Sequence, residues 1–477
     1  MSNKETKKFY VTTAIDYANA GPHIGHALEK IQADVVARYQ RLLDKDVYFL
    51  TGTDEHGIKI LRTAEREHKN VTDFVNENSD KFRKLLTSLN ISNDYFVRTS
   101  DKKVHWPGAQ FLWNKIFEAG DLYKANYKGF YCVGCEAFLT EKDLVDGKCP
   151  YHDKEPELIM EENYFFKISK YIKEIRKKIE SDELEIYPKT RKNEILAMID
   201  RGVEDISFSR PKDKLSWGID IPNDDTQVMY VWCDALSNYI SALGFGTDDD
   251  EDYKKFWPAD LHIVGKDILR FHAIIWPAML LSARLSLPKK IFVHGFLNSG
   301  GKKMSKSLGN VITPEEIIEE YGSEALRYYL LREVTSYEDG DITKEKFKTA
   351  YNANLANGLG NLASRIMKMA ESNLDRPVDI EREVFSSDFL DNLEFHKFMD
   401  YVWEQISETD LYIQETEPFK LIKVNPAQAK DVIRDLVQKL SSIAVLLEPV
   451  MPETAQKIQN AIKENRMPAE PLFVRKN

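Results

Sequence analysis

Residues 9–43 read FYVTTAIDYANAGPHIGHALEKIQADVVARYQRLL, and this stretch decides the fold class. The aromatic and β-branched run from Phe9 to Thr13 predicts a buried strand. A glycine–proline turn follows, and residues 27–43 then carry the apolar spacing of a helix. A second strand is expected at 47–51. Strand, helix and strand in this order predict a parallel sheet that is covered by helices.

The strand signal returns far along the chain, at 261–264 and 291–294, on either side of a helical stretch from Phe271 to Leu281. Between the two halves lies a lysine- and glutamate-rich segment that breaks this rhythm, so we expect an insertion there. From Tyr351 onward apolar residues recur at helical spacing, which predicts a helix bundle.

We therefore expect an α/β fold in which a Rossmann-type parallel-sheet domain is split by an insertion and followed by an all-α helix bundle. The two halves of the sheet domain are expected at 1–116 and 206–325, with the insertion between them at 117–205. A junction at 326–350 then leads to the helix bundle at 351–477.

The composition limits the class of protein. A chain of 477 residues is longer than one hydrophobic core usually supports. The net charge of −11 argues against unspecific coating of nucleic acid, although a local basic surface can still hold a folded RNA. No apolar run reaches the length of a membrane span, and the polar N-terminus has no apolar segment typical of secretion. We expect a cytoplasmic protein that binds no membrane.

The run His23-Ile24-Gly25-His26 follows the first strand and opens the first helix. Free backbone N–H groups and the helix dipole favour a phosphate at such a position, so this is a candidate ATP site. Gly25 would remove the side chain that blocks a close-lying adenine. By itself the run is as compatible with a structural turn.

A second signal lies at 300–307, which reads GGKKMSKS. A flexible glycine pair followed by closely spaced ammonium groups can close over a triphosphate and neutralise charge in the transition state. The candidates are Lys303 and Lys306. Composition alone favours the plainer interpretation, a solvated lysine-rich turn.

Three of the four cysteines form the pattern Cys132-X-X-Cys135 and, after thirteen residues, Cys149-X-X-His152. Three thiolates and one imidazole at this spacing are typical of tetrahedral zinc sites. A closed set of four ligands leaves no open coordination position, so we expect one structural Zn²⁺ per chain. Buried cysteines without a metal are the less favoured alternative.

With both phosphate signals present, the chain resembles the class I aminoacyl-tRNA synthetases. The resemblance implies that His23, His26 and Lys306 stabilise the phosphates of Mg²⁺-bound ATP while the amino-acid carboxylate attacks the α-phosphorus. It further implies that Lys303 is catalytic. The residues implied to bind ATP are His23, Gly25, His26, Asp267, Lys303 and Lys306.

Within that class, four stretches are similar to the methionyl-tRNA synthetases. They read AIDYAN at 14–19, GTDEHG at 52–57, YVWCDA at 230–235 and VGKDILRFH at 264–272. The resemblance implies that Asp54 binds the α-ammonium of methionine. The residues implied to surround the thioether are Ile15, Tyr17, Trp232, Ala235, Tyr239, Ile268, His272 and Trp276. Sulfur favours contact with aromatic rings, which suits this set.

In the expected bundle, residues 357–365 read NGLGNLASR and are similar to the anticodon-reading helix of that family. Asn361 and Arg365 would contact anticodon bases, since a spacing of four places both on one helix face. Phe419 stands where the family commonly has tryptophan, and it can still stack on a base.

The expected partners are tRNA(Met), methionine and ATP, and the expected state is a monomer. The alternatives are a class I synthetase for leucine, isoleucine, valine or cysteine, an inactive tRNA-binding paralogue, and a nucleotidylyltransferase. Enzymes for branched amino acids carry a large editing domain, and fewer than a hundred residues are available at 117–205. The closed Cys3His set also offers no position for a cysteine substrate.

Overall fold

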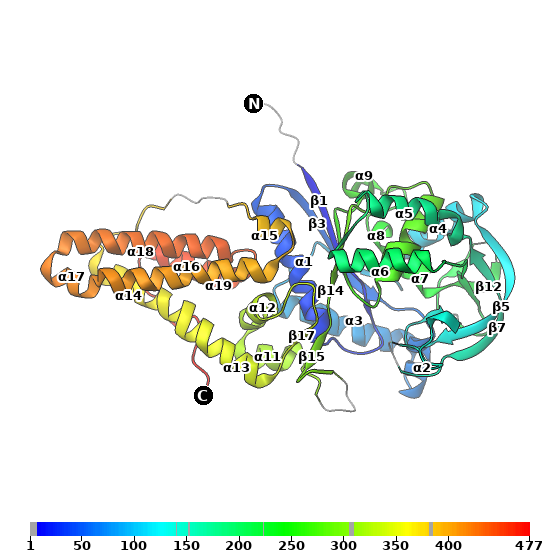
Figure 1. Cartoon of the computed structure of the whole chain (residues 1–477), viewed down its shortest axis with the longest axis horizontal. Coiled ribbons are helices and arrows are strands. Elements are labelled where there is room, and N and C mark those ends of the chain that lie inside the picture. Colours follow the sequence, from blue (N-terminus) through cyan, green and yellow to red (C-terminus); the bar gives the residue numbers. More distant parts are fainter. Residues whose placement is uncertain (1–6, 140, 151–152, 223, 305–309, 381–384) are drawn as a thin grey trace, which may run out of the picture. The chain divides into compact units, whose positions relative to one another are not determined.

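The computed structural model describes residues 7–139, 141–150, 153–222, 224–304, 310–380 and 385–477. The chain divides into two units (Figure 1). The first comprises Met1–Pro22, Asp46–Leu86 and Asn93–His294, and the second comprises His23–Lys45, Thr87–Ser92 and Gly295–Asn477.

A seven-stranded sheet forms the centre of the first unit, and every pairing within it is parallel. The strands follow the order β2-β3-β1-β13-β14-β8, with β4 also paired to β3. Their bounds are β1 Lys8–Thr13, β2 Asp16–Tyr17, β3 Asp46–Asp54, β4 Tyr95–Arg98, β8 Glu185–Tyr187, β13 Leu261–Gly265 and β14 Lys290–His294. The four predicted strands are confirmed. β3 extends beyond the strand expected at 47–51 as far as Asp54, because Thr53 pairs with Asp16 and with Arg98.

The strand order reverses beside β1. From β1 the sheet continues to β3 and β4 on one side and to β13 and β14 on the other. In open α/β sheets such a reversal leaves a crevice outside the carboxyl ends of the two strands, and ligands bind there. The carboxyl ends of β1 and β13 are therefore the expected ligand position of this unit.

The helices of the first unit carry much of its buried apolar surface. They are α2 Ile58–Arg66, α3 Val71–Ser88, α4 His105–Glu118, α5 Ile172–Glu180, α6 Lys189–Asp200, α7 Val231–Leu236, α8 Asn238–Ser241, α9 Glu251–Phe256 and α10 Trp276–Ser282, with short turns η1 Glu141–Asp143 and η2 Ile168–Tyr171. The helix predicted from Phe271 to Leu281 is confirmed, and its first turn, η3 Phe271–Ile275, is π-helical. Turns of this kind are frequent at functional sites.

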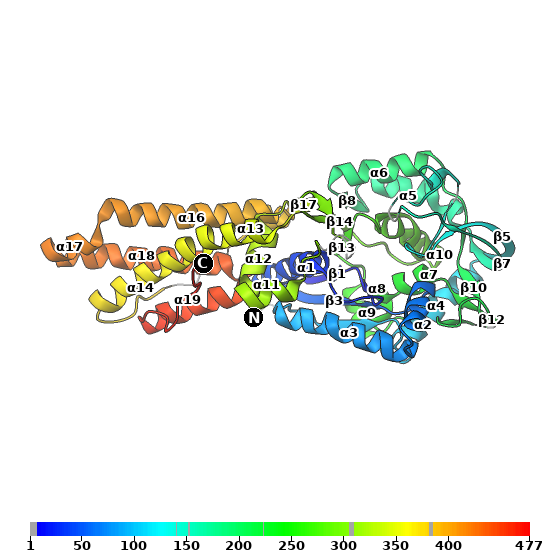
Figure 2. The same cartoon turned by 90° about the horizontal axis from the view of Figure 1, so that it is seen from below.

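A separate antiparallel sheet occupies much of the predicted insertion. Its order is β6-β5-β7-β9, and β5 and β7 form a long ribbon (Figure 2). The bounds are β5 Leu122–Cys132, β6 Ala137–Leu139, β7 Glu157–Phe166 and β9 Ile206–Ser207. A small sheet follows, formed by β10 Ser209–Pro211, β11 Asp220–Ile221 and β12 Asp224–Met229. One strand within 117–205, β8, instead joins the parallel sheet beside β14.

The second unit is mainly helical, as predicted from Tyr351 onward. Its helices are α1 Ile24–Leu42, α11 Pro314–Tyr321, α12 Ser323–Arg332, α13 Lys344–Ala350, η5 Tyr351–Gly360, α14 Asn361–Asn373, α15 Asp388–Asp391, α16 Phe395–Thr416, α17 Pro418–Val424, α18 Pro426–Leu447 and α19 Pro452–Glu464. Three short strands accompany them, β15 Leu297–Ser299, β16 Lys302–Lys303 and β17 Gly340–Asp341. The helix α18 buries Leu436 and Leu440 against the bundle, which confirms the apolar face read from the sequence.

A buried ion pair joins α1 to α12 within the second unit. The guanidinium of Arg327 lies 2.7 Å from a carboxylate oxygen of Asp34, and both side chains are fully buried. Arg327 also donates to the carbonyl oxygens of Leu89, Pro449 and Val450. A buried charge is tolerated where its donors are satisfied in this way. In the part of the chain that the structure describes, no helix is long and apolar enough to span a membrane.

Candidate active site and metal centre

The two predicted histidines form the amino end of α1. His23 is the N-cap, and its Nδ1 accepts a hydrogen bond from the Gly25 N–H at 3.1 Å. Nδ1 of His26 accepts from the His23 N–H at 3.0 Å, and the rings stack with centroids 3.7 Å apart. Since both Nδ1 atoms accept, the proton of each neutral ring lies on Nε2. In each neutral ring, Nε2–H is therefore the hydrogen-bond donor.

Gly25 permits this arrangement. A Cβ atom at residue 25 would lie 3.0 Å from Cε1 of His23, so any side chain would press on the ring. The sequence prediction gave Gly25 a role against adenine, and the structure adds this local one.

The glycine pair of the lysine-bearing stretch forms the turn between β15 and β16. Gly300 and Gly301 have φ angles of 61° and 72°, a region that favours glycine. The Gly301 N–H donates to Asp341 at 2.8 Å, which ties the turn to β17. Lys306 lies outside the described residues, and only the backbone of Lys303 is described. Their predicted roles stay predictions.

Four of the predicted methionine residues contact one another in the first unit. Tyr239 of α8 lies with its hydroxyl 2.7 Å from Nε2 of His272 in η3. The Tyr239 ring also packs against Trp276 at 5.8 Å between centroids, and Trp232 meets His272 edge to face at 6.4 Å. Among the described residues, the buried indole N–H groups of Trp232 and Trp276 have no hydrogen-bond partner.

The remaining predicted residues include three for the methionine side chain, Ile15, Tyr17 and Ile268, and one for ATP, Asp267. Ile15 and Tyr17 follow the carboxyl end of β1, and Asp267 and Ile268 follow that of β13. These are the two strand ends at which the sheet order reverses. Ile15 and Ile268 pack partly buried against the hydrophobic core of this unit, and Ala235 is buried in α7.

Asp54 ends β3 with its side chain half-buried. Burial, together with the negative charge of Asp234, raises the pKa of Asp54 well above its ordinary value. A nearby cation stabilises the ionised form of a carboxylate in this setting. An ammonium group is a suitable partner for Asp54.

Sequence reasoning missed the buried carboxylate of Asp234. It accepts from His56 at 2.6 Å and from His105 at 2.7 Å, and His105 also contacts Ser241 at 2.8 Å. Burial opposes ionisation of Asp234, but His56 and His105 outweigh it and lower its pKa. A signal was present, because Asp234 is a charged residue inside the apolar run at 230–236.

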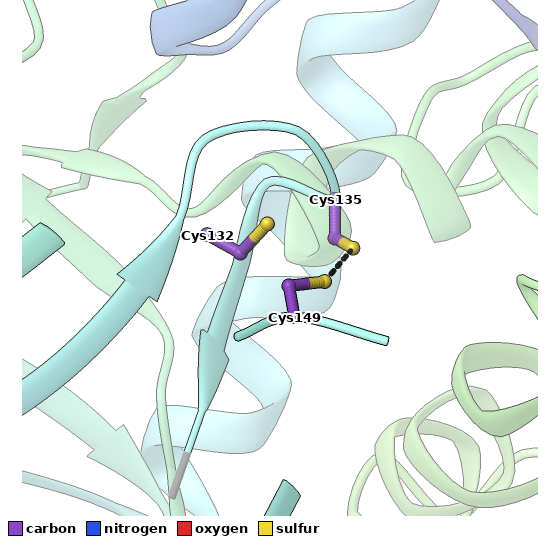
Figure 3. A group of neighbouring side chains, drawn as sticks. All are labelled: Cys132, Cys135 and Cys149. Carbon is purple, nitrogen blue, oxygen red and sulfur yellow. Dashed lines mark hydrogen bonds between the residues drawn. The ribbon is translucent and has the colours of Figure 1, made fainter. Parts of the chain in front are cut away.

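The cysteine cluster is built on two turns of the insertion. Cys132 ends β5, Cys135 lies in the turn before β6, and Cys149 lies in a second turn (Figure 3). Their three Sγ atoms lie within 4.8 Å of one another, and those of Cys135 and Cys149 are 3.5 Å apart. Thiolates around one tetrahedral Zn²⁺ are about 3.8 Å apart, given Zn–S bonds of about 2.3 Å. The three cysteines fit such an ion. His152 lies outside the described residues.

The predicted anticodon residues belong to the bundle of the second unit. Asn361 begins α14 and is exposed, and Arg365 one turn later forms an ion pair with Asp410 of α16. Phe419 of α17 leaves 49% of its surface exposed, which is a large exposure for an aromatic ring. The pairing with Asp410 was not predicted from the sequence.

Comparison with known proteins covers nearly the whole chain. A family model described as tRNA synthetases class I (M) matches residues 9–156 and 142–367, and one described as the anticodon binding domain of methionyl tRNA ligase matches residues 368–471. A methionine–tRNA ligase of Caldanaerobacter subterraneus subsp. tengcongensis is 42% identical over 470 residues, which are 95% of this chain and 73% of that protein. One of Rhizobium meliloti is 42% identical over 96% of this chain and 92% of its own length.

A solved structure gives the same result. The Mycobacterium tuberculosis methionyl-tRNA synthetase in complex with methionyl-adenylate superimposes with a TM-score of 0.90 at 37% identity, covering 99% of this chain and 100% of that one. Sequence and fold agree along the full length. The chain therefore belongs to the methionyl-tRNA synthetase family of class I tRNA synthetases.

Proposed function

We propose that this protein activates methionine with ATP to give methionyl-adenylate and pyrophosphate, and then transfers the methionyl group to the 3′ end of tRNA(Met). The observation that carries the proposal is the contact among Trp232, Tyr239, His272 and Trp276 beside the loop that leaves β13. Four polarizable or aromatic rings suit a thioether better than a branched aliphatic side chain.

We propose that Asp54 binds the α-ammonium of methionine and that Ile15, Tyr17, Ala235 and Ile268 complete the surroundings of its side chain. The raised pKa of Asp54 supports this role, because a carboxylate under negative potential is stabilised by an incoming ammonium group. The indole N–H groups of Trp232 and Trp276, which have no hydrogen-bond partner in the described part of the chain, also support a ligand at this set.

In the activation step the methionine carboxylate oxygen attacks the α-phosphorus of ATP, and the bond to the pyrophosphate oxygen breaks in line. No side chain acts as a nucleophile, so positioning and charge stabilisation supply the catalysis. We propose that His23 and His26 donate to the phosphates through Nε2, a role that their capping bonds support. Lys303, Lys306, Gly25 and Asp267 would complete the binding of Mg²⁺-bound ATP.

We propose that Cys132, Cys135, Cys149 and His152 hold one structural Zn²⁺. The spacing of the three sulfur atoms supports thiolate ligation. The ion would fix the two turns of the insertion and take no part in the chemistry.

We propose that the bundle reads the anticodon through Asn361, Arg365 and Phe419. The exposure of Asn361 and Phe419 supports this assignment. The parts of the chain would be those expected from the sequence, with the junction at 326–350 contacting the tRNA stem. The antiparallel strands β5 to β7 support an insertion, although β8 returns to the parallel sheet within 117–205. We expect a monomer in the cytoplasm, and the elution volume of the purified protein tests the first point.

ATP–pyrophosphate exchange, measured with each of the twenty amino acids, tests the proposed function. Exchange should depend on methionine. Exchange that depends on leucine, isoleucine, valine or cysteine would assign the chain to another substrate, and absence of exchange with every amino acid would indicate an inactive tRNA-binding protein.

A further inference from the structure

Glu136 follows Cys135 directly in the sequence, and its carboxylate accepts hydrogen bonds from other parts of the first unit. Its backbone has a φ of 51° and its side chain is 4% exposed. Oε1 accepts from the Tyr17 hydroxyl at 2.7 Å and from the Lys59 N–H at 2.5 Å. Oε2 accepts from the Tyr131 hydroxyl. The side chain therefore joins the cysteine turn, the segment after β1 and the start of α2.

The start of α2 is shaped to receive this carboxylate. Its N-cap, Gly57, offers no side chain to the free N–H groups of the first turn, and Glu136 accepts from one of them, that of Lys59. A carboxylate at a helix N-terminus is also favoured by the helix dipole. A Cβ atom at Gly57 would lie 2.8 Å from both Glu136 Oε1 and the Tyr17 hydroxyl. With a φ of 107°, Gly57 is the residue type that permits this approach.

The backbone of Glu136 also accepts a buried hydrogen bond. Its carbonyl oxygen accepts from the buried Tyr230 hydroxyl at 2.7 Å. Tyr230 lies two residues before Trp232, which belongs to the proposed methionine set. The turn that carries Glu136 thus contacts two segments that carry methionine residues, one through Tyr17 and one through Tyr230.

We propose that Glu136 is a positioning residue for methionine: it orients Tyr17 and thereby couples the cysteine turn of the insertion to amino-acid binding. This inference rests on the proposed function, in which Tyr17 lines the methionine side chain. The residue does not touch the reacting atoms. Its loss acts through Tyr17, whose ring is then no longer held at its hydroxyl.

The test uses the full-length, metal-loaded protein and steady-state ATP–pyrophosphate exchange. Glu136→Ala and Tyr17→Phe should each raise the KM for methionine about tenfold, the usual scale for losing one charge-assisted hydrogen bond. The KM for ATP and the metal content should stay at the wild-type values. Glu136→Gln should keep the KM for methionine near the wild-type value, because its amide oxygen still accepts from the Tyr17 hydroxyl and the Lys59 N–H.

Two further measurements separate positioning from plain structural support. The double variant Glu136→Ala/Tyr17→Phe should have a KM for methionine no higher than that of the poorer single variant, because each change already removes the hydrogen bond between Tyr17 and Glu136. Tyr131→Phe is the matched control, since it removes another hydroxyl donor to the same carboxylate and should leave the KM for methionine near the wild-type value.

Several results would overturn the inference. They are an unchanged KM for methionine in Tyr17→Phe, additive effects in the double variant, or a loss of metal from Glu136→Ala with no change in the KM for methionine. If Glu136→Ala does not fold, Tyr17→Phe and Glu136→Gln still decide the matter. A wild-type protein without methionine-dependent exchange would instead refute the proposed function itself.

Discussion

The Tyr239 hydroxyl donates a hydrogen bond to Nε2 of His272. The contact made by the other ring nitrogen, Nδ1, determines the direction of this hydrogen bond. Nδ1 of His272 lies 2.9 Å from the carbonyl oxygen of Ile268, which can only accept. Nδ1 of a neutral ring therefore carries the proton, and Nε2 must accept from Tyr239 at 2.7 Å. The backbone carbonyl of Ile268, before the start of η3, thus sets the orientation of the tyrosine hydroxyl in the methionine set.

Tyr239→Phe should weaken methionine binding. The variant leaves Nε2 of the buried His272 without its donor, a cost of about 1–3 kcal/mol for an unsatisfied buried group. We expect the KM for methionine in pyrophosphate exchange to rise about tenfold, with the KM for ATP unchanged. Tyr48→Phe is the control, because among the described residues that hydroxyl makes a single long contact, 3.5 Å to the carbonyl oxygen of Ala242. Equal effects of both variants would contradict the assignment.

Cys149→Ala should abolish metal binding. With one thiolate removed, the two remaining cysteines and His152 would hold Zn²⁺ too weakly to survive dialysis against a chelator. Elemental analysis should give about one zinc ion per wild-type chain and close to none in the variant. Cys233→Ala is the control, since Cys233 is buried and lies outside the cluster. Full zinc retention by Cys149→Ala would disprove the proposed ligand set.

The extent to which the fold could be predicted depends on strand length and burial. β1, β3, β13 and β14 are buried parallel strands, and such strands appear in the sequence as continuous apolar or β-branched runs. β8 has three residues, of which only Ile186 is buried, and its partner β14 lies about a hundred residues further along the chain. No local pattern marks a strand whose existence depends on so distant a partner.

Asp34→Asn should destabilise the second unit in a pH-dependent way. Burial raises the pKa of Asp34, but Arg327 and Arg38 outweigh this and lower it below the ordinary 3.8. The stabilising contribution is therefore present above that value and is lost as the pH falls through the lower folded pKa. We expect Asp34→Asn to cost about 3–5 kcal/mol at pH 7 and progressively less in acid, measured by urea unfolding.

Asp400→Asn is the matched control for this pair. Asp400 is largely exposed and lies 3.2 Å from Arg332, so its loss should cost less than about 1 kcal/mol. A difference between wild type and Asp34→Asn that stays constant from pH 7 into acid would contradict the titration of Asp34.

His26→Gln should slow activation without destabilising α1. A glutamine at the third helical position can accept from the N-cap N–H, as His26 does now, so the capping box survives. The imidazole Nε2–H is replaced by an amide NH2 on a side chain of different shape, and losing one correctly placed donor to transition-state charge commonly lowers kcat about 100-fold. Single-turnover formation of the adenylate measures this step. His68→Asn, an exposed position, should have no effect.

The site was predictable where residues close in sequence carry the chemistry, and not where distant residues meet. His23, Gly25 and His26 form one cap, and Cys132 and Cys135 form one turn, so short patterns identified them. Tyr17 and Glu136 are 119 positions apart, and His56 and Asp234 are 178 apart. Such pairs exist because strands and turns bring them together, which composition and spacing do not encode.

Phe419→Ala should weaken tRNA charging and leave amino-acid activation intact. Phe419 of α17 is 49% exposed, and stacking of one base on an aromatic ring is worth about 1–3 kcal/mol. We expect the KM for tRNA(Met) to rise about tenfold in aminoacylation, with pyrophosphate exchange unchanged, and Phe419→Trp to lower it because a larger ring stacks more strongly. Val424→Ala is the control on the same helix, since an exposed aliphatic side chain offers no ring.

Point variants are preferable to removal of the bundle, because Arg327 donates to the carbonyl oxygens of Pro449 and Val450 and would lose both. An unchanged KM for tRNA in both Phe419 variants would remove this residue from the anticodon contact.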